Sequence, residues 1–368
     1  MTIEEKGEIG NGKIKVLVVD DSAFMRVLVS DMLNAGPGIE VVGVAKNGEE
    51  GVEKANTLSP DVITMDVEMP KMNGIEAVEH IMAEKPTPVV MLSALTKKNV
   101  DVTLEALAKG AFDFVTKPSG SLSLEIDRVK GELITKIRGA YAYAGKIGTG
   151  TGMKRLQAVK KYEAPIHYYA HKRAPPAEEG RISKKVVVIG SSTGGPKALD
   201  EIFSALPDGI PAGMLVVQHM PPYFTKSLAE RLDMHSPVHV REGEEGDMIT
   251  NGSALVAPGD YHITVNSGKI HLNKEAPVNA IRPSVDVTMQ SVAKTYGSNT
   301  VGVLLTGMGK DGAEGMKVIK EWGGKTIACD ENTSIIFGMP KEAIKLGCVD
   351  KIVPLYKIAD EIRKSLWS

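Results

Sequence analysis

A short turn bracketed by glycines carries two adjacent serines and a threonine, in the stretch KKVVVIGSSTGGPKAL that runs from Lys184 to Leu199. The apolar run VVVIG is typical of a buried strand, and the residues after the paired glycines have the pattern of a helix. Gly190, Ser192 and Gly194 match the spacing G-x-S-x-G, which exposes a nucleophilic oxygen on a strand-to-helix turn. The free N–H groups at the N-terminus of that helix would stabilise an oxyanion formed beside it.

Other interpretations of this turn require residues that it lacks. The stretch has no GK[ST] ending, which argues against the phosphate-binding loop of a nucleoside triphosphatase. It also lacks the G-x-G-x-x-G spacing of a dinucleotide-binding turn. A glycine turn whose serines only cap the following helix remains an open alternative from the turn alone.

A catalytic serine needs a base, and the base needs an acid that orients it. His219, in LVVQHMPP, directly follows a predicted parallel strand, so we expect it at the same sheet edge as Ser192. Asp311, in VLLTGMGKDGAEG, follows another core strand within a glycine-rich loop. These three residues are the candidate nucleophile, base and orienting acid, in a chain order that differs from the three standard examples. The other histidines fall in helix, linker or hairpin contexts: His80, His167, His171, His235, His239, His262 and His271.

Carboxylates form a second candidate site, nearer the N-terminus. Asp20 and Asp21 follow the run IKVLVV, and Asp66 follows the run VITM. The carboxyl ends of strands in an open α/β sheet are where ligands bind, so the three acids should converge there. They would repel one another unless a hard cation joined them, and Mg²⁺ suits a few carboxylates plus water.

Two further residues complete this second pattern. Ser93 ends a strand in VVMLSALT, and Lys117 follows another in FVTKP. A hydroxyl and an ammonium group beside a metal-bound aspartate would neutralise the charge of an aspartyl phosphate. Each residue alone is weak evidence, whereas all five at successive strand ends are a specific signal.

The elements that must position these residues alternate between short apolar strands and helical patterns. Such alternation predicts parallel sheets covered on both faces, in an α/β, doubly wound fold. We expect strands at residues 14–19, 41–45, 61–65, 88–92 and 112–115, a helix at 121–140, and then strands at 185–190, 213–218, 300–307 and 325–329. Residues 237–273 have the turns APGD and NSG and predict short strands and hairpins.

A change in character between these two units predicts a linker. We place a first domain at residues 13–138, a linker at 139–183, with a helical start, and a second domain at 184–368. Five of the nine tyrosines lie in the linker stretch. They could dock on a domain surface or a partner, or simply be exposed.

The bulk composition limits the classes of function. The length of 368 residues allows two domains with full-sized cores. A formal net charge of −2 argues against nucleic acid as the main partner, because phosphate binding normally requires a basic excess. No apolar run approaches the roughly 18 residues of a membrane span, and the polar N-terminus is unlike a signal or transit peptide. Cys329 and Cys348 fit core thiols, so we expect a cytoplasmic protein without membrane insertion.

Residues 13–135 resemble a response-regulator receiver domain, on the strength of the five strand-end residues described above. The resemblance implies a flavodoxin-like five-stranded parallel sheet. It implies that Asp66 accepts phosphate from a chemotaxis histidine kinase, that Asp20, Asp21 and Asp66 hold Mg²⁺, and that Ser93 and Lys117 transmit the change. The aromatic residue usual near the fifth strand is either Phe112 or Phe114.

Residues 184–366 resemble the catalytic domain of the chemotaxis protein-glutamate methylesterases, through GSSTGG, QHMPPYFT, APGD, RPSVDV, LTGMGKDG and FGMP. The resemblance implies a mainly parallel, doubly wound hydrolase domain with a small hairpin. The family's nucleophile immediately precedes the threonine, which selects Ser192 over Ser191. It also implies roles for Thr193 and Met308 near the oxyanion.

Together the two resemblances imply a phosphorylation-activated serine hydrolase without a cofactor for its hydrolytic chemistry. The expected substrates are glutamate methyl esters on the cytoplasmic helices of chemoreceptors, with methanol released, and receptor glutamines as a second, deamidation substrate. Two alternatives stay open: a general small-ester hydrolase, and a signalling adaptor whose hydrolase fold is inactive.

Overall fold

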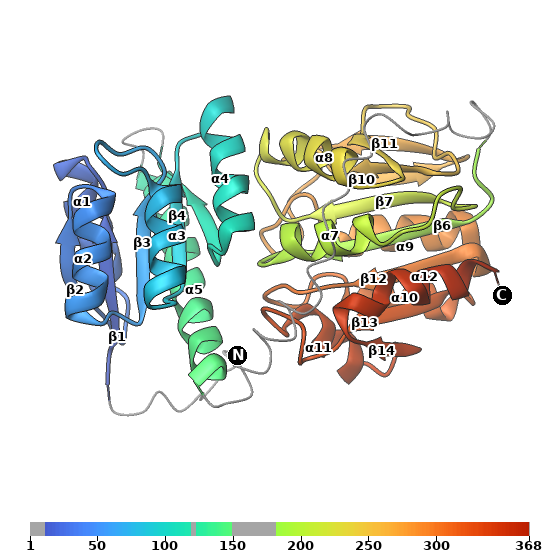
Figure 1. The fold of residues 1–368 in the computed structure, drawn as a ribbon. Helices are drawn as coiled ribbons and strands as arrows, with labels where there is room; N and C mark the ends of the chain where they lie inside the picture. Colours follow the sequence, from blue (N-terminus) through green and yellow to red (C-terminus); the bar gives the residue numbers. More distant parts are fainter. Residues whose placement is uncertain (1–11, 119–122, 149–181, 368) are drawn as a thin grey trace. The chain divides into compact units, whose positions relative to one another are not determined.

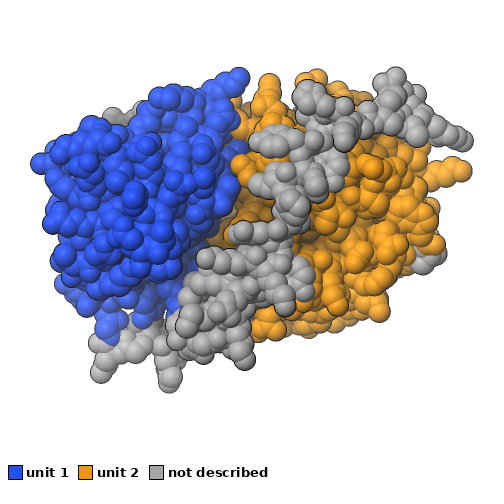
Figure 2. All heavy atoms as spheres, viewed as in Figure 1, with its two compact units in different colours: residues 1–149 blue, residues 150–368 orange. Residues whose placement is uncertain are grey.

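The computed structural model describes residues 12–118, 123–148 and 182–367. The chain divides into two compact units at residues 149 and 150, which Figure 2 shows in different colours. Each unit has its own parallel sheet and is described by itself (Figure 1).

The first unit is a five-stranded parallel sheet in the order β2-β1-β3-β4-β5. Its strands and helices are β1 Ile14–Val19, α1 Ala23–Asn34, β2 Ile39–Ala45, α2 Gly48–Leu58, β3 Val62–Asp66, α3 Gly74–Glu84, β4 Val89–Ser93, α4 Lys97–Lys109, β5 Asp113–Thr116 and α5 Ser123–Gly148. The order reverses between β1 and β3, so the crevice for ligands opens at the carboxyl ends of those two strands.

Local sequence explains where these elements begin. The central strands β3 and β4 are buried throughout, as expected for apolar runs in a sheet covered on both faces. Ser22 caps α1 by accepting the Met25 N–H, directly after the acidic pair that ends β1. Asn73 and Glu76 form a capping box that starts α3. Helix starts therefore follow the strand ends at which the predicted site lies.

Helix α5 continues past the predicted end at residue 140 to Gly148, so the expected helical start of the linker is part of α5. Tyr143 packs on Phe112, with 5.6 Å between the ring centroids. Phe112 and Phe114 are both buried, the former just before β5 and the latter within it. The rest of the predicted linker, residues 149–181, lies outside the described residues, as do three of its tyrosines.

The second unit is built on a seven-stranded parallel sheet in the order β14-β13-β12-β6-β7-β9-β8. Its elements are β6 Val186–Ser191, α7 Gly195–Ser204, β7 Gly213–Gln218, α8 Phe224–His235, β8 His239–Glu242, β9 Ser253–Val256, β10 His262–Asn266, β11 Lys269–Asn273, α9 Val285–Tyr296, β12 Thr300–Leu304, α10 Ala313–Glu321, β13 Lys325–Cys329, α11 Met339–Lys345, β14 Lys351–Val353 and α12 Ile358–Trp367, with 3₁₀ turns at Gly297–Asn299 and Leu355–Lys357. The chain adds strands on one side of β6 and then on the other. The topological switch point, where ligands bind, therefore lies around β6.

The prediction of hairpins over residues 237–273 was wrong in its first half. Strands β8 and β9 pair in parallel with each other, and β9 pairs in parallel with β7, so both extend the main sheet. The second half, β10 and β11, is the expected antiparallel hairpin, closed at Ser267 and Gly268, both of which have positive φ. The error has a physical source: β8 reads HVRE, whose alternation suits a half-buried strand of either kind.

Helix α9 packs closely over the carboxyl end of β6. A Cβ atom on Gly190 would lie 2.4 Å from Val285 Cγ1, so the glycine is needed for this approach. Val285, Met289 and Val292 belong to the apolar core of the unit and are fully buried. The start of α9 is therefore fixed beside the turn that carries the serines. In the ranges that the structure describes, no helix is long and apolar enough to cross a membrane.

Candidate active site

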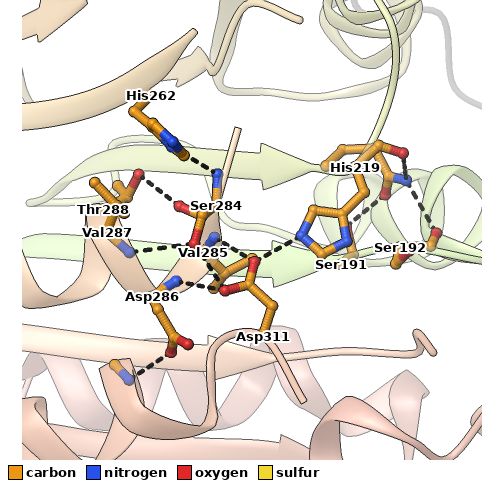
Figure 3. Close-up of polar contacts among 12 residues, drawn as sticks. Ser191, Ser192, His219, His262, Ser284, Val285, Asp286, Val287, Thr288 and Asp311 are labelled. Atoms are coloured by element: carbon orange, nitrogen blue, oxygen red, sulfur yellow. Dashed lines mark hydrogen bonds and ion pairs between the residues drawn. The ribbon is translucent and has the colours of Figure 1, made fainter. Parts of the chain in front are cut away.

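Ser191, the last residue of β6, is fully buried and forms part of the scaffold of the turn. Its hydroxyl donates to Gln218 Oε1 at 2.7 Å. The amide of Gln218 in turn donates to the carbonyl oxygens of Ser192, at 2.9 Å, and of His219, at 3.2 Å. Figure 3 shows these contacts side by side. Ser191 thus fixes the two loops through Gln218 and has no hydroxyl free for chemistry.

Ser192 is the first residue beyond β6, and its side chain is partly exposed. Its N–H donates to the Thr306 carbonyl at 3.0 Å, which ties the turn to the loop after β12. Gly194 has a φ of +77°, and a Cβ on Gly195 would lie 1.9 Å from Gln218 Oε1. The two glycines are therefore required by backbone conformation and by close approach, as the spacing predicts.

His219 and Asp311 are joined by a hydrogen bond of 2.8 Å between Nε2 and Oδ2 (Figure 3). The His219 side chain is 10% exposed and that of Asp311 is 1% exposed. An ionised Asp311 only accepts, so we assign the ring hydrogen to Nε2. Nδ1 is then the basic nitrogen that remains for a serine hydroxyl.

All three predicted triad residues lie at the topological switch point, after β6, β7 and β12. Within the described ranges, no hydrogen bond joins Ser192 Oγ to His219; such bonds are often long before substrate binds. The structure therefore pairs the predicted base and acid and places the serine on the adjoining turn.

The Asp311 carboxylate is held by the first turn of α9. Besides His219 it accepts from Ser284 Oγ at 2.8 Å, from Val285 N–H at 2.7 Å and from Asp286 N–H at 3.1 Å. Burial alone would raise the pKa of Asp311, but the hydrogen bond and charge of His219 and the α9 donors lower it to about 2. Asp311 is therefore an anion throughout the neutral range and holds its imidazole partner firmly.

A second layer of contacts was missed from sequence. Ser284 caps α9, and its N–H donates to Nδ1 of the buried His262 at 3.2 Å. His262 Nε2 lies 3.3 Å from the carbonyl oxygen of Ala276. The signal for the cap is present in RPSVDV, where a serine precedes a helical pattern with an acid in its first turn. The partner of that cap depends on tertiary structure.

Thr193 and Met308, predicted near the oxyanion, lie in the same region of the unit. Thr193 is buried, and its carbonyl accepts from Thr306 Oγ1 at 2.9 Å. Met308 is partly buried in the loop after β12, and a Cβ on Gly338 would lie 3.2 Å from its Cα. Both residues belong to loops that adjoin Ser192, and their contact with an oxyanion stays a prediction.

Asp286 is a buried acid beside Asp311, with an unusual protonation equilibrium. Burial, followed by the negative charge of Asp311, raises the pKa of Asp286 to about 7. Two neighbouring carboxyl groups whose pKa values are driven apart share their charge unequally. Asp311 keeps the anionic role, and Asp286 is the group that binds a proton.

This difference predicts a pH dependence of stability. The ordinary pKa of an aspartate is 3.8, so between about pH 4 and 7 the folded chain binds one proton more at Asp286 than the unfolded chain does. The stabilising effect is complete below that window and is lost as the pH rises through it. Asp286→Asn should therefore gain stability relative to the wild type between pH 5 and pH 8, measured by urea unfolding of both proteins. A difference that is the same at both pH values would contradict the assignment.

The predicted acidic site of the first unit is also assembled. Oxygens of Asp20, Asp21 and Asp66 lie within 4.8 Å of one another. Lys117 Nζ lies 2.8 Å from Asp20 Oδ2 and 2.8 Å from Asp66 Oδ2. Burial raises the pKa of Asp66 to about 6, although the Lys117 ammonium lowers it. Three carboxylates at this spacing fit a hard divalent cation that keeps some of its waters.

Ser93 does not bond to Asp66 in this structure. Its buried hydroxyl accepts from Thr103 Oγ1 at 2.8 Å and lies 3.3 Å from the Ala94 carbonyl oxygen. The strands that carry the two residues are neighbours, since Asp66 pairs with Leu92 in the sheet register. Ser93 is thus linked to α4 and lies one residue beyond that register position.

The fold and the two sites define a class of protein: a response-regulator receiver unit joined to an α/β hydrolase unit with a serine, histidine and aspartate at its switch point. Comparison with known families agrees with this class. The model of the CheB methylesterase family matches residues 187–362, and that of the response regulator receiver domain matches residues 16–126.

Curated relatives extend the similarity over nearly the whole chain, and three named protein-glutamate methylesterase/protein-glutamine glutaminase illustrate it. The protein of Archaeoglobus fulgidus is 50% identical over 96% of this chain and 98% of its own. That of Pyrococcus horikoshii is 47% identical over 96% and 94%, and that of Thermotoga maritima is 46% identical over 95% and 97%. The chain belongs to the CheB methylesterase family.

Proposed function

We propose that this chain hydrolyses methyl esters of glutamate side chains on chemoreceptors, releasing methanol, and that it deamidates receptor glutamines in the same site. The observation that supports this most is the bond between His219 and Asp311 beside the Ser192 turn, in a chain of the CheB methylesterase family. The substrates are those named for its relatives. An intact site of this kind argues against an inactive adaptor.

The proposed reaction is acyl transfer through Ser192. His219 Nδ1 takes the hydroxyl proton as Ser192 Oγ attacks the ester carbonyl carbon, and a tetrahedral oxyanion forms. The imidazolium then protonates the departing methoxide, which leaves as methanol, and an acyl-enzyme remains. Water, deprotonated by His219, attacks the acyl carbon and releases the glutamate carboxylate and Ser192. With a glutamine substrate the leaving group is ammonia, and the other steps are the same.

Each supporting residue has a specific task in this scheme. Asp311 keeps the ring hydrogen on Nε2 and stabilises the imidazolium. The first turn of α7 supplies N–H groups and partial positive charge beside the oxyanion. The family resemblance adds Thr193 and Met308 to this region. These steps assign hydrolytic chemistry to the residues of the chain alone.

The first unit is proposed to control the second by phosphorylation. Asp66 would accept phosphate from a chemotaxis histidine kinase, with Mg²⁺ held by Asp20, Asp21 and Asp66. The cation would neutralise charge on the transferred phosphoryl oxygens. Lys117 and Ser93 would respond to the new phosphate. We place the domains at residues 13–138 and 184–368, joined by a linker at 139–183, and the protein in the cytoplasm, where the receptor helices would be accessible.

Removal of residues 1–138 is expected to raise the rate of methanol release, because the receiver domain would no longer restrain the esterase domain. Phosphorylation can act only through a difference in free energy between restrained and released states. We therefore expect a phosphodonor to stimulate the full chain and to have no effect on the truncated one. Asp66→Asn is the matched control, since it keeps the domain but loses the phosphate acceptor. Equal rates for the truncated and unphosphorylated full-length proteins would contradict the inhibitory role.

The substrate class is tested by comparing methylated receptor fragments with small soluble esters. Methanol release from the receptor fragments is the expected result. Rapid cleavage of soluble esters without activity on receptors would favour a general small-ester hydrolase instead.

A further inference from the structure

The buried Asp286 contacts the acid of the proposed triad, although the reaction scheme assigns it no task. It is 6% exposed and lies in the first turn of α9, two residues after the cap Ser284. Its backbone N–H donates to Asp311 Oδ1 at 3.1 Å. Its own Oδ1 accepts from the N–H of Gly315, in the first turn of α10, at 2.7 Å. Figure 3 shows Asp286 directed away from Asp311 toward this second contact.

The two acids exchange contacts between the starts of neighbouring helices. Asp311 lies just before α10 and binds N–H groups of α9, at Val285 and Asp286. Asp286 lies in α9 and binds an N–H group of α10. The first N–H groups of a helix have no partner within the helix, and a negatively charged group is favoured beside them. Each helix start is therefore satisfied by an acid from the other.

This exchange matters because the loop that carries Asp311 has little rigidity of its own. Gly309 and Gly312 flank Lys310 and Asp311 and have φ angles of +79° and +91°. Glycine has the greatest backbone freedom of any residue, so the loop must be held from outside. A Cβ on Gly315 would lie 2.6 Å from Met289 Cβ and 3.2 Å from Asp286 Cα. The approach of α10 to α9 thus depends on this glycine.

We propose that Asp286 is a positioning residue of the esterase site, which holds Asp311 in line with His219 by binding the first turn of α10. The inference rests on the proposed triad and adds to it. Asp286 acts through Asp311, whose Oδ2 bonds to His219. A loop displaced by about 1 Å would misalign the imidazole, and such a displacement can lower a rate about 100-fold.

The test compares Asp286→Ala with Asp286→Asn in the full-length chain, using methanol release from methylated receptor fragments. Asparagine has an oxygen that can accept from Gly315 N–H, whereas alanine has no acceptor. We expect Asp286→Ala to lower kcat about 10- to 100-fold with KM changed less than about twofold, and Asp286→Asn to restore most of the rate. The proton NMR resonance of the His219–Asp311 hydrogen bond should shift or vanish in Asp286→Ala and persist in Asp286→Asn.

Gly315→Ala tests the same contact from the α10 side, which covers the case in which Asp286→Ala does not fold. We expect it to lower kcat and to shift the same resonance. Gly131→Ala is the matched control, because Gly131 lies inside α5 with nothing within 4 Å of an added Cβ. Wild-type kcat in Asp286→Ala or in Gly315→Ala, or an Asp286→Asn as slow as Asp286→Ala, would overturn the proposal. Ser192→Ala in the same assay separates this outcome: if it stays active, the triad itself is wrong.

Discussion

Replacing Ser192 with alanine is expected to lower methanol release from methylated receptor fragments by about 10⁴-fold or more, with the fold intact. The hydroxyl is the only part of the side chain that is removed, and without it no acyl-enzyme can form. Removal of the nucleophile from a triad leaves only the slow reaction that binding and the oxyanion site can support. The measurement is the release of methanol per enzyme, with and without a phosphodonor.

The adjacent Ser191→Ala is the most informative comparison for this experiment. Ser191 bonds to Gln218, and Gln218 holds the carbonyl of Ser192. The loss of one buried hydrogen bond costs about 1–3 kcal/mol, so we expect a lower unfolding temperature and an activity loss of about tenfold or less. Ser204→Ala, at the far end of α7, should match the wild type. Full methanol release by Ser192→Ala would refute the triad and leave the turn as a cap.

Much of this site could be predicted because it depends on local patterns. Apolar strands followed directly by a polar residue gave the positions of Ser192, His219 and Asp311, and parallel strands bring their carboxyl ends to one edge. The strands that carry His219 and the cysteine-ended β13 have the predicted bounds. Strand β12 ends at Leu304, three residues before the predicted end, because its last residues turn into the loop of Asp311.

The parts that could not be predicted depend on contacts between distant segments. Asp286 and Asp311 are 25 residues apart, and nothing in the spacing shows that their helix starts meet. Ser191 and Ser192 differ by a single position, yet only the Gln218 contact shows which hydroxyl is used by the scaffold. Strand β14 was missed because it has three residues, KIV, with little buried surface of its own. Tertiary packing decides these cases, and local propensity does not.

Replacing Asp311 with asparagine is expected to lower kcat about 10³- to 10⁴-fold while leaving KM nearly unchanged. The asparagine side chain has nearly the same shape, so the bonds from Ser284 and from the α9 backbone can be kept on its oxygen. Its NH₂ group would then face His219 and donate to Nε2. The ring hydrogen would move to Nδ1, where a base is needed, and the imidazole could no longer accept the proton of Ser192. The measurement is kcat and KM for methanol release from receptor fragments.

The outcome distinguishes the role of the acid from a general loss of charge. Asp360→Asn, on α12 with its side chain 64% exposed, is the control and should match the wild type. The asparagine variant at 311 should also lose the downfield proton resonance of the His219 bond, because that nitrogen no longer carries the hydrogen. A kcat within tenfold of the wild type would show that His219 keeps its productive tautomer without Asp311, and the orienting role would have to be reassigned. A large rise in KM with an unchanged kcat would instead indicate that Asp311 shapes the substrate site, since uniform binding alone would be lost.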